Sequence, residues 1–169
     1  MHDRVRGPGY EANDPRLLLW VHATLVDTAL RVYSRFIGAL SPAEAEQYYE
    51  ESTVVAEVLG VPLAIQPSNL AEFRAYVRTM VGSLQVGDDA RRLAEQVLHP
   101  RLPWAVAPMV EPAAVLARQV TVGLLPPPLR EGYHLSWDPG RQALLLAAGV
   151  SARTVLPRLP AVARRVTAG

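Results

Sequence analysis

Histidine is the residue of this chain with the most versatile chemistry, and it occurs four times, as His2, His22, His99 and His134. A histidine can ligate a metal, move protons, or lie in a core with its ring nitrogens hydrogen-bonded. The chain has no cysteine, which excludes disulfides, thiolate zinc sites, iron–sulfur clusters and cysteine nucleophiles. Any metal would therefore rest on histidine, aspartate or glutamate side chains.

His22 stands in the most apolar segment, Leu17 to Val26, which has helical character. Desolvation in such a helix keeps an imidazole neutral and available to a hydrogen-bond acceptor or a metal. On spacing alone, a buried hydrogen-bonded histidine is favoured over a ligand. Thr24 and Asp27 are polar neighbours that could orient a group, although a salt bridge from Asp27 to Arg31 is the simpler interpretation.

The other histidines give weaker signals. His2 and Arg6 stand four residues apart, so that a helix would place both side chains on one face. Taken alone, such a pair indicates no function. His99 and His134 flank proline-rich turns, which predicts a place at the surface for both.

Other catalytic motifs are missing from the sequence. The turn formed by residues 6–9 has two glycines but no preceding strand, so it does not match a phosphate-binding loop. None of the serines has the context of a nucleophile elbow. The glutamates of residues 42–59 are interpreted as a solvated acidic face of a helix, and not as a metal site.

Length and charge restrict the class of protein. The chain has 169 residues, of which 50% are hydrophobic and 20% charged, and this predicts one compact domain. All 17 basic residues are arginines, and 16 acidic residues balance them to a net charge of +1. We therefore expect no positive electrostatic potential that would attract nucleic acid or an anionic membrane. Leu17 to Val26 is about half of the roughly 20 residues that a membrane span needs. A cytoplasmic location is the default, with a signal or anchor upstream of Met1 left open.

Helix start and stop signals predict an all-α fold of six to seven helices around a buried central helix, residues 15–39. Proline and glycine mark the ends of nearly every segment with helical periodicity. The central helix is expected to be surrounded by protein in its first half. Further helices are predicted over 42–59, 70–83, 88–98 and from 111 to the prolines at 126–128, with a final pair from 138 that is interrupted at 149–151. Residues 1–157 form the predicted domain, and residues 158–169 a disordered tail.

Several blocks in order resemble one family, the oxygenase domain shared by the endoplasmic-reticulum-bound oxygenase MpaB and the rubber oxygenases, also called latex-clearing proteins. The resemblance covers nearly the whole chain. Its most specific block is Leu18-Leu19-Trp20-Val21-His22-Ala23-Thr24-Leu25. The other blocks are His2-Asp3-Arg4-Val5-Arg6-Gly7, Tyr10-Glu11-Ala12-Asn13-Asp14-Pro15, Tyr48-Tyr49-Glu50-Glu51, Leu59-Gly60-Val61-Pro62, Pro67, Leu124-Leu125-Pro126, and Leu129-Arg130 with Tyr133 and Trp137.

The resemblance implies an all-helical oxidoreductase that holds one haem b and uses dioxygen on a small hydrophobic substrate. The family's His-x-x-x-Arg element matches His2, as the proximal ligand of the haem iron, and Arg6, as a partner of a haem propionate or of the residues that support the ligand. A planar guanidinium suits a carboxylate. His22 matches a family histidine and is placed near the haem pocket as structural support, with direct ligation as the second choice.

Family domains begin well upstream of the histidine that matches His2, and those upstream helices supply residues on the distal side of the haem. We therefore expect this chain to be the C-terminal part of the domain, with apolar surface exposed for association, weak haem retention and no turnover when isolated. Whether the chain is itself an enzyme stays open. The alternative is a non-catalytic truncated helical domain or interaction module.

Overall fold

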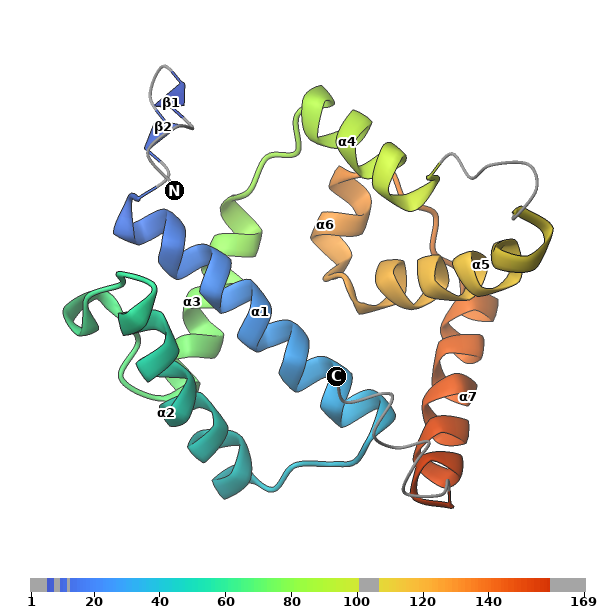
Figure 1. Cartoon of the computed structure of the whole chain (residues 1–169), viewed down its shortest axis with the longest axis horizontal. Helices are drawn as coiled ribbons and strands as arrows, with labels where there is room; N and C mark the ends of the chain where they lie inside the picture. Colours follow the sequence, from blue (N-terminus) through green and yellow to red (C-terminus); the bar gives the residue numbers. More distant parts are fainter. Residues whose placement is uncertain (1–5, 8–9, 12, 101–106, 159–169) are drawn as a thin grey trace. The chain divides into compact units, whose positions relative to one another are not determined.

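The computed structural model describes residues 6–7, 10–11, 13–100 and 107–158, and the regular elements in these ranges are helices apart from two short paired strands. This confirms the predicted all-α fold (Figure 1). The elements are β1 (Arg6–Gly7), β2 (Tyr10–Glu11), α1 (Pro15–Phe36), α2 (Pro42–Val58), η1 (Leu63–Ile65), α3 (Leu70–Ser83), α4 (Asp88–Leu98), α5 (Ala107–Leu124), α6 (Pro127–Gly132), α7 (Pro139–Val155) and η2 (Leu156–Arg158).

The sequence predicts a single domain, and the described residues group into two compact units. The first unit takes its described residues from Met1–Ser34 and Gly38–Met80, and so holds most of α1, α2, η1 and most of α3. The second takes its described residues from Arg35–Ile37 and Val81–Gly169, and so holds α4 to α7. Residues 159–169 of the predicted tail lie outside the described residues, while Arg158 ends η2.

The core of the first unit is built on one stripe of α1. Leu19, His22, Ala23 and Val26 are buried, and their spacing of three and four residues places them on one side of the helix. Val21 and Leu25, by contrast, are 49% and 61% exposed. Burial of α1 in its first half is therefore confined to one side and does not surround the helix as expected. The buried cluster joins Leu19 to Ala56 and Val61, with Leu18 and Tyr76 packed against it.

The ends of α2 follow the predicted signals. Ser41 and Glu44 form the capping box: the Ser41 Oγ accepts from the Glu44 N–H at 3.2 Å, and Glu44 Oε2 accepts from the Ser41 N–H at 2.8 Å. At the other end Gly60 has φ +95°, a left-handed conformation that glycine adopts without steric cost. The prediction of α2 is therefore confirmed to within one residue at its C-terminus.

An aromatic contact joins α2 to α3. The rings of Tyr49 and Phe73 are 4.8 Å apart between centroids, and both side chains are buried. The Tyr49 hydroxyl donates to the Pro67 carbonyl at 2.6 Å. At the start of α3 the Asn69 Oδ1 accepts from the Glu72 N–H at 2.9 Å, as the sequence predicts. These contacts hold the segment between the two helices against the core.

In the second unit α5 packs on α7. At Gly123 of α5 the packing is tight: a Cβ would lie 2.5 Å from Cη2 of Trp137 and 2.6 Å from Cδ2 of Leu145. The Arg130 guanidinium stacks 5.1 Å from the Trp137 ring centroid. Trp137 thus lies between the end of α6 and the α5–α7 contact.

Three predicted helix bounds are wrong. The first helix ends at Phe36 and not at residue 39; the Gly38 N–H turns back to the Tyr33 carbonyl. The fifth begins at Ala107 and keeps Pro112 inside, although a proline there leaves one helical hydrogen bond unmade. The last helix runs unbroken through Gly149, where a Cβ would meet the Arg35 backbone oxygen at 2.6 Å. Glycine at 149 thus permits close packing within its unit.

The described ranges contain no candidate transmembrane helix. None of them is both long enough and apolar enough to pass through a bilayer.

Candidate functional site

His22 is a buried histidine of the first unit. It lies in the middle of α1, on the same stripe as Leu19 and Val26, and its exposed fraction is 6%. The stripe exists because apolar residues recur every three to four positions, and His22 interrupts it with a polar ring. An imidazole has therefore been placed where the helix otherwise buries only hydrocarbon.

The Nε2 atom of His22 is buried and has no hydrogen-bond partner among the described residues. An unpartnered buried polar atom costs roughly 1–3 kcal/mol, so such atoms are uncommon in native cores. Burial also lowers the pKa of His22 from 6.5, because desolvation disfavours the imidazolium. The ring is therefore held neutral, with a nitrogen available to a donor, an acceptor or a metal. The sequence favours a hydrogen-bonded core histidine; the structure leaves Nε2 unpaired.

The polar neighbours of His22 on α1 are engaged with their own helix. The Thr24 Oγ1 donates to the Val21 carbonyl at 2.7 Å. The Asp27 carboxylate pairs with Arg31 at 2.6 Å, which confirms the simpler interpretation of that residue. Neither side chain is therefore positioned by these contacts to orient the His22 ring.

The predicted ligand pair stands at the start of the chain. His2 lies outside the described residues. Arg6 belongs to β1, and its Cα pairs with that of Glu11 across the two-stranded sheet, so the helix that would place His2 and Arg6 on one face is not formed at Arg6. The roles of His2 and Arg6 stay predictions. In the part of the chain that the structure describes, no three histidine, aspartate or glutamate side chains gather to hold a metal ion.

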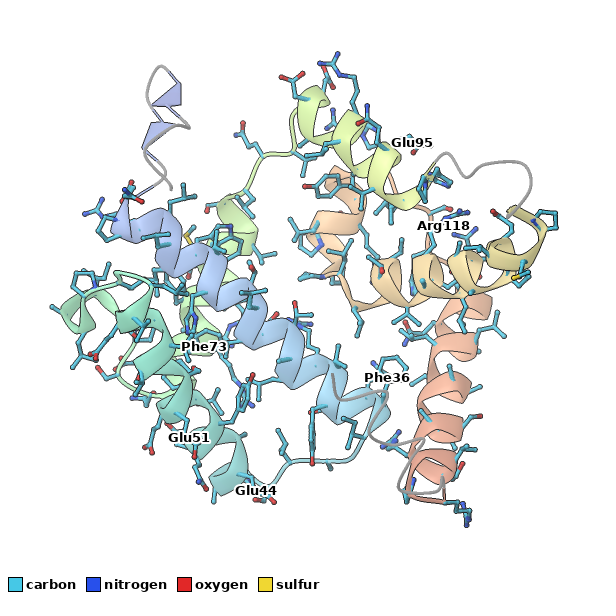
Figure 2. All side chains as sticks on the ribbon, viewed as in Figure 1. Phe36, Glu44, Glu51, Phe73, Glu95 and Arg118 are labelled. Carbon is cyan, nitrogen blue, oxygen red and sulfur yellow. The ribbon has the colours of Figure 1, made fainter. Side chains whose placement is uncertain are left out.

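A mainly apolar pocket of about 320 Å³ lies in the first unit between α1 and α2. Its walls include Leu30, Tyr33 and Tyr48, with Glu44 and Glu51 at the polar side, and Figure 2 shows both glutamates along α2. Sequence reasoning missed this pocket because each residue fits an ordinary amphipathic pattern. The only available signal was the apolar spacing of α1, and it does not say which positions face a cavity.

The acidic face predicted on α2 is mostly, but not wholly, solvated. Glu50, Glu51 and Glu57 are exposed as expected. Glu46 is half-buried and accepts a hydrogen bond from the Leu70 N–H at 2.9 Å. The surface positions predicted for His99 and His134 are confirmed, since both are exposed, and the two line one pocket of the second unit.

Comparison with known proteins places the chain in a family. Residues 1–154 match the family described as ER-bound oxygenase mpaB/B'/Rubber oxygenase, catalytic domain. An uncharacterized protein of Mycobacterium bovis and one of Mycobacterium tuberculosis are each 28% identical to it over 134 residues, 79% of this chain and 51% of theirs. The chain thus spans about half the length of the curated relatives it matches. No solved structure matches it. Because the family match covers most of the sequence, the chain belongs to the mpaB/rubber oxygenase catalytic domain family.

Proposed function

We propose that the protein is a haem b-dependent oxygenase that uses dioxygen on a small hydrophobic substrate. Family membership supports oxygenase chemistry. The observation that carries the haem proposal is the buried, unpartnered Nε2 of His22 in a family block of α1. A neutral imidazole with an open nitrogen has the chemistry of an iron ligand or of a group that supports one. His22, whose side chain the structure describes, therefore has chemistry that suits the cofactor.

The three residues take different roles in this proposal. His2 would hold the haem iron, and Arg6 would hold a haem propionate through its planar guanidinium. His22 supports the pocket, because its burial keeps the ring neutral and its position in a packed helix fixes the ring in place. Haem, when bound, supplies the redox chemistry that activates dioxygen. The protein binds and orients the cofactor and excludes water from it.

The apolar substrate has a candidate place in the pocket between α1 and α2. Ligand pockets are typically about 300–1,000 Å³ and mainly apolar. This one has a volume of about 320 Å³, and Ala29, Leu30 and Leu40 contribute apolar lining. It lies in the same unit as His22. Bulkier side chains at Ala29 would therefore impair use of a substrate without changing the haem spectrum.

A haem titration followed by the Soret band tests the proposal. It is made on the 169-residue chain and on an extended chain, meaning any longer form that the same reading frame encodes. One haem per extended chain is expected, with weak retention by the shorter chain. His2→Ala should remove the band, His22→Ala should shift or weaken it, and the exposed-site control His99→Ala should leave it unchanged.

Two results would overturn parts of this assignment. Absence of haem binding in both forms would exclude the haem proposal. Loss of the band in His22→Ala with full binding in His2→Ala would make His22 the ligand and exclude His2.

A second candidate function is a non-catalytic helical domain or interaction module. The exposed apolar side chains of Val21 and Leu25, one turn apart on α1, favour it. It predicts a pigment-free, well-folded oligomer. Size-exclusion chromatography of the chain and of a Val21→Ser, Leu25→Ser double variant tests it, because only the unchanged chain should associate.

A further inference from the structure

A second pocket, of about 310 Å³, lies within the second unit. It is lined from the end of α4, from α5, from the segment between α6 and α7, and from the first turn of α7. The proposed oxygenase function gives no role to any of its residues. Its lining includes two arginines, two histidines and a serine, namely Arg118, Arg141, His99, His134 and Ser136.

Arg118 lines this pocket from α5. Its Nε donates to the Leu98 carbonyl at 2.9 Å, which holds the side chain of α5 against the end of α4 (Figure 2). Its Nη2 lies 3.9 Å from the Glu111 carboxylate, beyond hydrogen-bond distance. The terminal N–H groups of Arg118 therefore make no hydrogen bond to the described residues. The Nε end of the guanidinium is therefore held by the Leu98 carbonyl, and its terminal N–H groups are available to a ligand.

Arg141 lines the same pocket from α7 and is held in place by its neighbours. Its Nη1 donates to the Ser136 carbonyl at 2.7 Å and to the Ser136 Oγ at 3.0 Å. Its Nε lies 3.2 Å from the Asp138 carboxylate, which compensates part of the charge. These three contacts order a long side chain before any ligand arrives, which lowers the entropy cost of binding. They also bring a hydroxyl beside the guanidinium.

The backbone of His134 gives an independent observation. Its φ is 56°, and it is the non-glycine residue with positive φ in the described ranges. The Leu135 N–H bonds to the Arg130 carbonyl at 2.8 Å, so His134 occupies the position after α6 that glycine usually fills. A side chain in this conformation is strained, and such strain concentrates at binding sites. The fold needs only a glycine here, yet the position carries an imidazole at the pocket.

His99 completes the set from the end of α4. Its Nδ1 lies 3.0 Å from the Glu95 carboxylate, which orients the ring. The Glu95 side chain is 70% exposed and stands at the rim of the pocket, where solvent screens its charge. Glu111 and Asp138 likewise stand beside Arg118 and Arg141, so what the pocket offers an anion is fixed guanidinium N–H groups rather than an excess of positive charge. Beyond the polar groups, Leu98, Val122 and Leu135 add apolar surface.

We propose that this pocket binds a small phosphate monoester. Two ordered guanidiniums with a hydroxyl and imidazoles nearby suit a tetrahedral dianion, because planar N–H pairs match phosphate oxygens. The apolar lining suits the organic part of the ester. The pocket also lies in a volume range typical of sites for small molecules, roughly 300–1,000 Å³.

Calorimetric titration at constant ionic strength tests this with phenyl phosphate as the probe. Saturable binding at one site is expected, roughly ten-fold tighter than for inorganic phosphate or for benzoate. Phenol should not bind. Arg141→Gln should weaken binding roughly ten-fold, the loss expected for one charge-assisted contact. Arg153→Gln, which removes the same charge from α7 away from the pocket, should not.

His134→Gly separates binding from folding. Glycine relieves the strained backbone, so this variant should melt at the same temperature as the unchanged chain or higher. It should nevertheless bind phenyl phosphate several-fold more weakly. Equal binding by His134→Gly, an equal loss in Arg153→Gln, binding of phenol, or tighter binding of benzoate would each overturn the proposal.

Discussion

The carboxylate of Glu46 in α2 accepts a hydrogen bond from the backbone N–H of Leu70, the first residue of α3, with 2.9 Å between Oε1 and N. The first N–H groups of a helix have no partner within the helix. Glu46 supplies one from a different helix, and its negative charge also suits the positive end of the helix dipole. A side chain predicted to be a solvated surface residue thus fastens two helices of the first unit.

Replacing Glu46 should destabilise the first unit. Glu46→Ala leaves the N–H of the buried Leu70 unpaired and is expected to lower the free energy of unfolding by about 1–2 kcal/mol. Urea denaturation measures the change. The matched control is Glu57→Ala, an exposed position of the same helix, expected to stay within about 0.5 kcal/mol of the unchanged chain. Equal losses in both variants would refute the capping role.

Tyr49 should control stability at high pH. Burial, and then the charges of Glu72 and Glu46, raise the pKa of Tyr49 to about 12. The unfolded chain loses this proton near pH 10, so the stability that the neutral hydroxyl contributes is complete below pH 10 and is lost as the pH rises through about 12.

Tyr49→Phe tests that dependence. The variant loses the hydrogen bond to Pro67 and should be about 1 kcal/mol less stable at pH 7. Its stability should fall less steeply than that of the unchanged chain between pH 10 and 12. Tyr48→Phe, next along the helix, should have little effect at pH 7. Parallel pH profiles for Tyr49→Phe and the unchanged chain would contradict the prediction.

His22 should make the fold sensitive to acid. Because burial lowers the pKa of His22 below 6.5, the unfolded chain takes up a proton before the folded chain does. Stability is therefore complete above pH 6.5 and is lost as the pH falls through the folded pKa. His22→Leu removes both the titration and the unpartnered Nε2. We expect it to be at least as stable at pH 8, with an advantage that grows below pH 6.5; thermal melts at both pH values give the comparison, and a constant difference would argue against it.

Two substitutions of glycine by alanine should change the stability of the protein in opposite directions. A Cβ at Gly123 would lie 2.5 Å from the Trp137 ring, so Gly123→Ala should destabilise the second unit by about 1–3 kcal/mol. At Gly82 of α3 nothing lies within 4 Å of an added Cβ. Gly82→Ala should therefore stabilise by about 0.5–1 kcal/mol, since alanine loses less entropy in a helix. Near-ultraviolet circular dichroism of Trp137 would report the strain, and stabilisation of both variants would be the wrong outcome.

Local signals explain which helices could be predicted. The bounds near Ser41, Gly60 and Asn69 depend on neighbouring residues alone, through capping and a left-handed turn, and they agree with the structure. The sequence predicts a break at Gly149, because glycine weakens a helix by about 1 kcal/mol. The structure keeps it helical for close packing, and packing partners distant in sequence cannot be seen in a local pattern.

The same distinction between local signals and distant packing applies to the candidate sites. The apolar spacing of α1 predicts the burial of His22, but not that Nε2 lacks a partner, because a partner can come from any element. His99 and His134 each have the flanking turns of a surface residue. Their shared pocket depends on how α4, α5 and α7 pack, which no motif encodes.

The contact between Phe73 and Tyr49 also limits how fast the Phe73 ring can rotate. Phe73 is 1% exposed and its ring is tilted by 37° against that of Tyr49. A ring enclosed at this density can rotate by 180° only when its neighbours move apart. The rate of Phe73 ring flips, measured by NMR relaxation dispersion, therefore reports how often the core between α2 and α3 opens. The same opening would admit water to the first unit, in which the ring of His22 is buried.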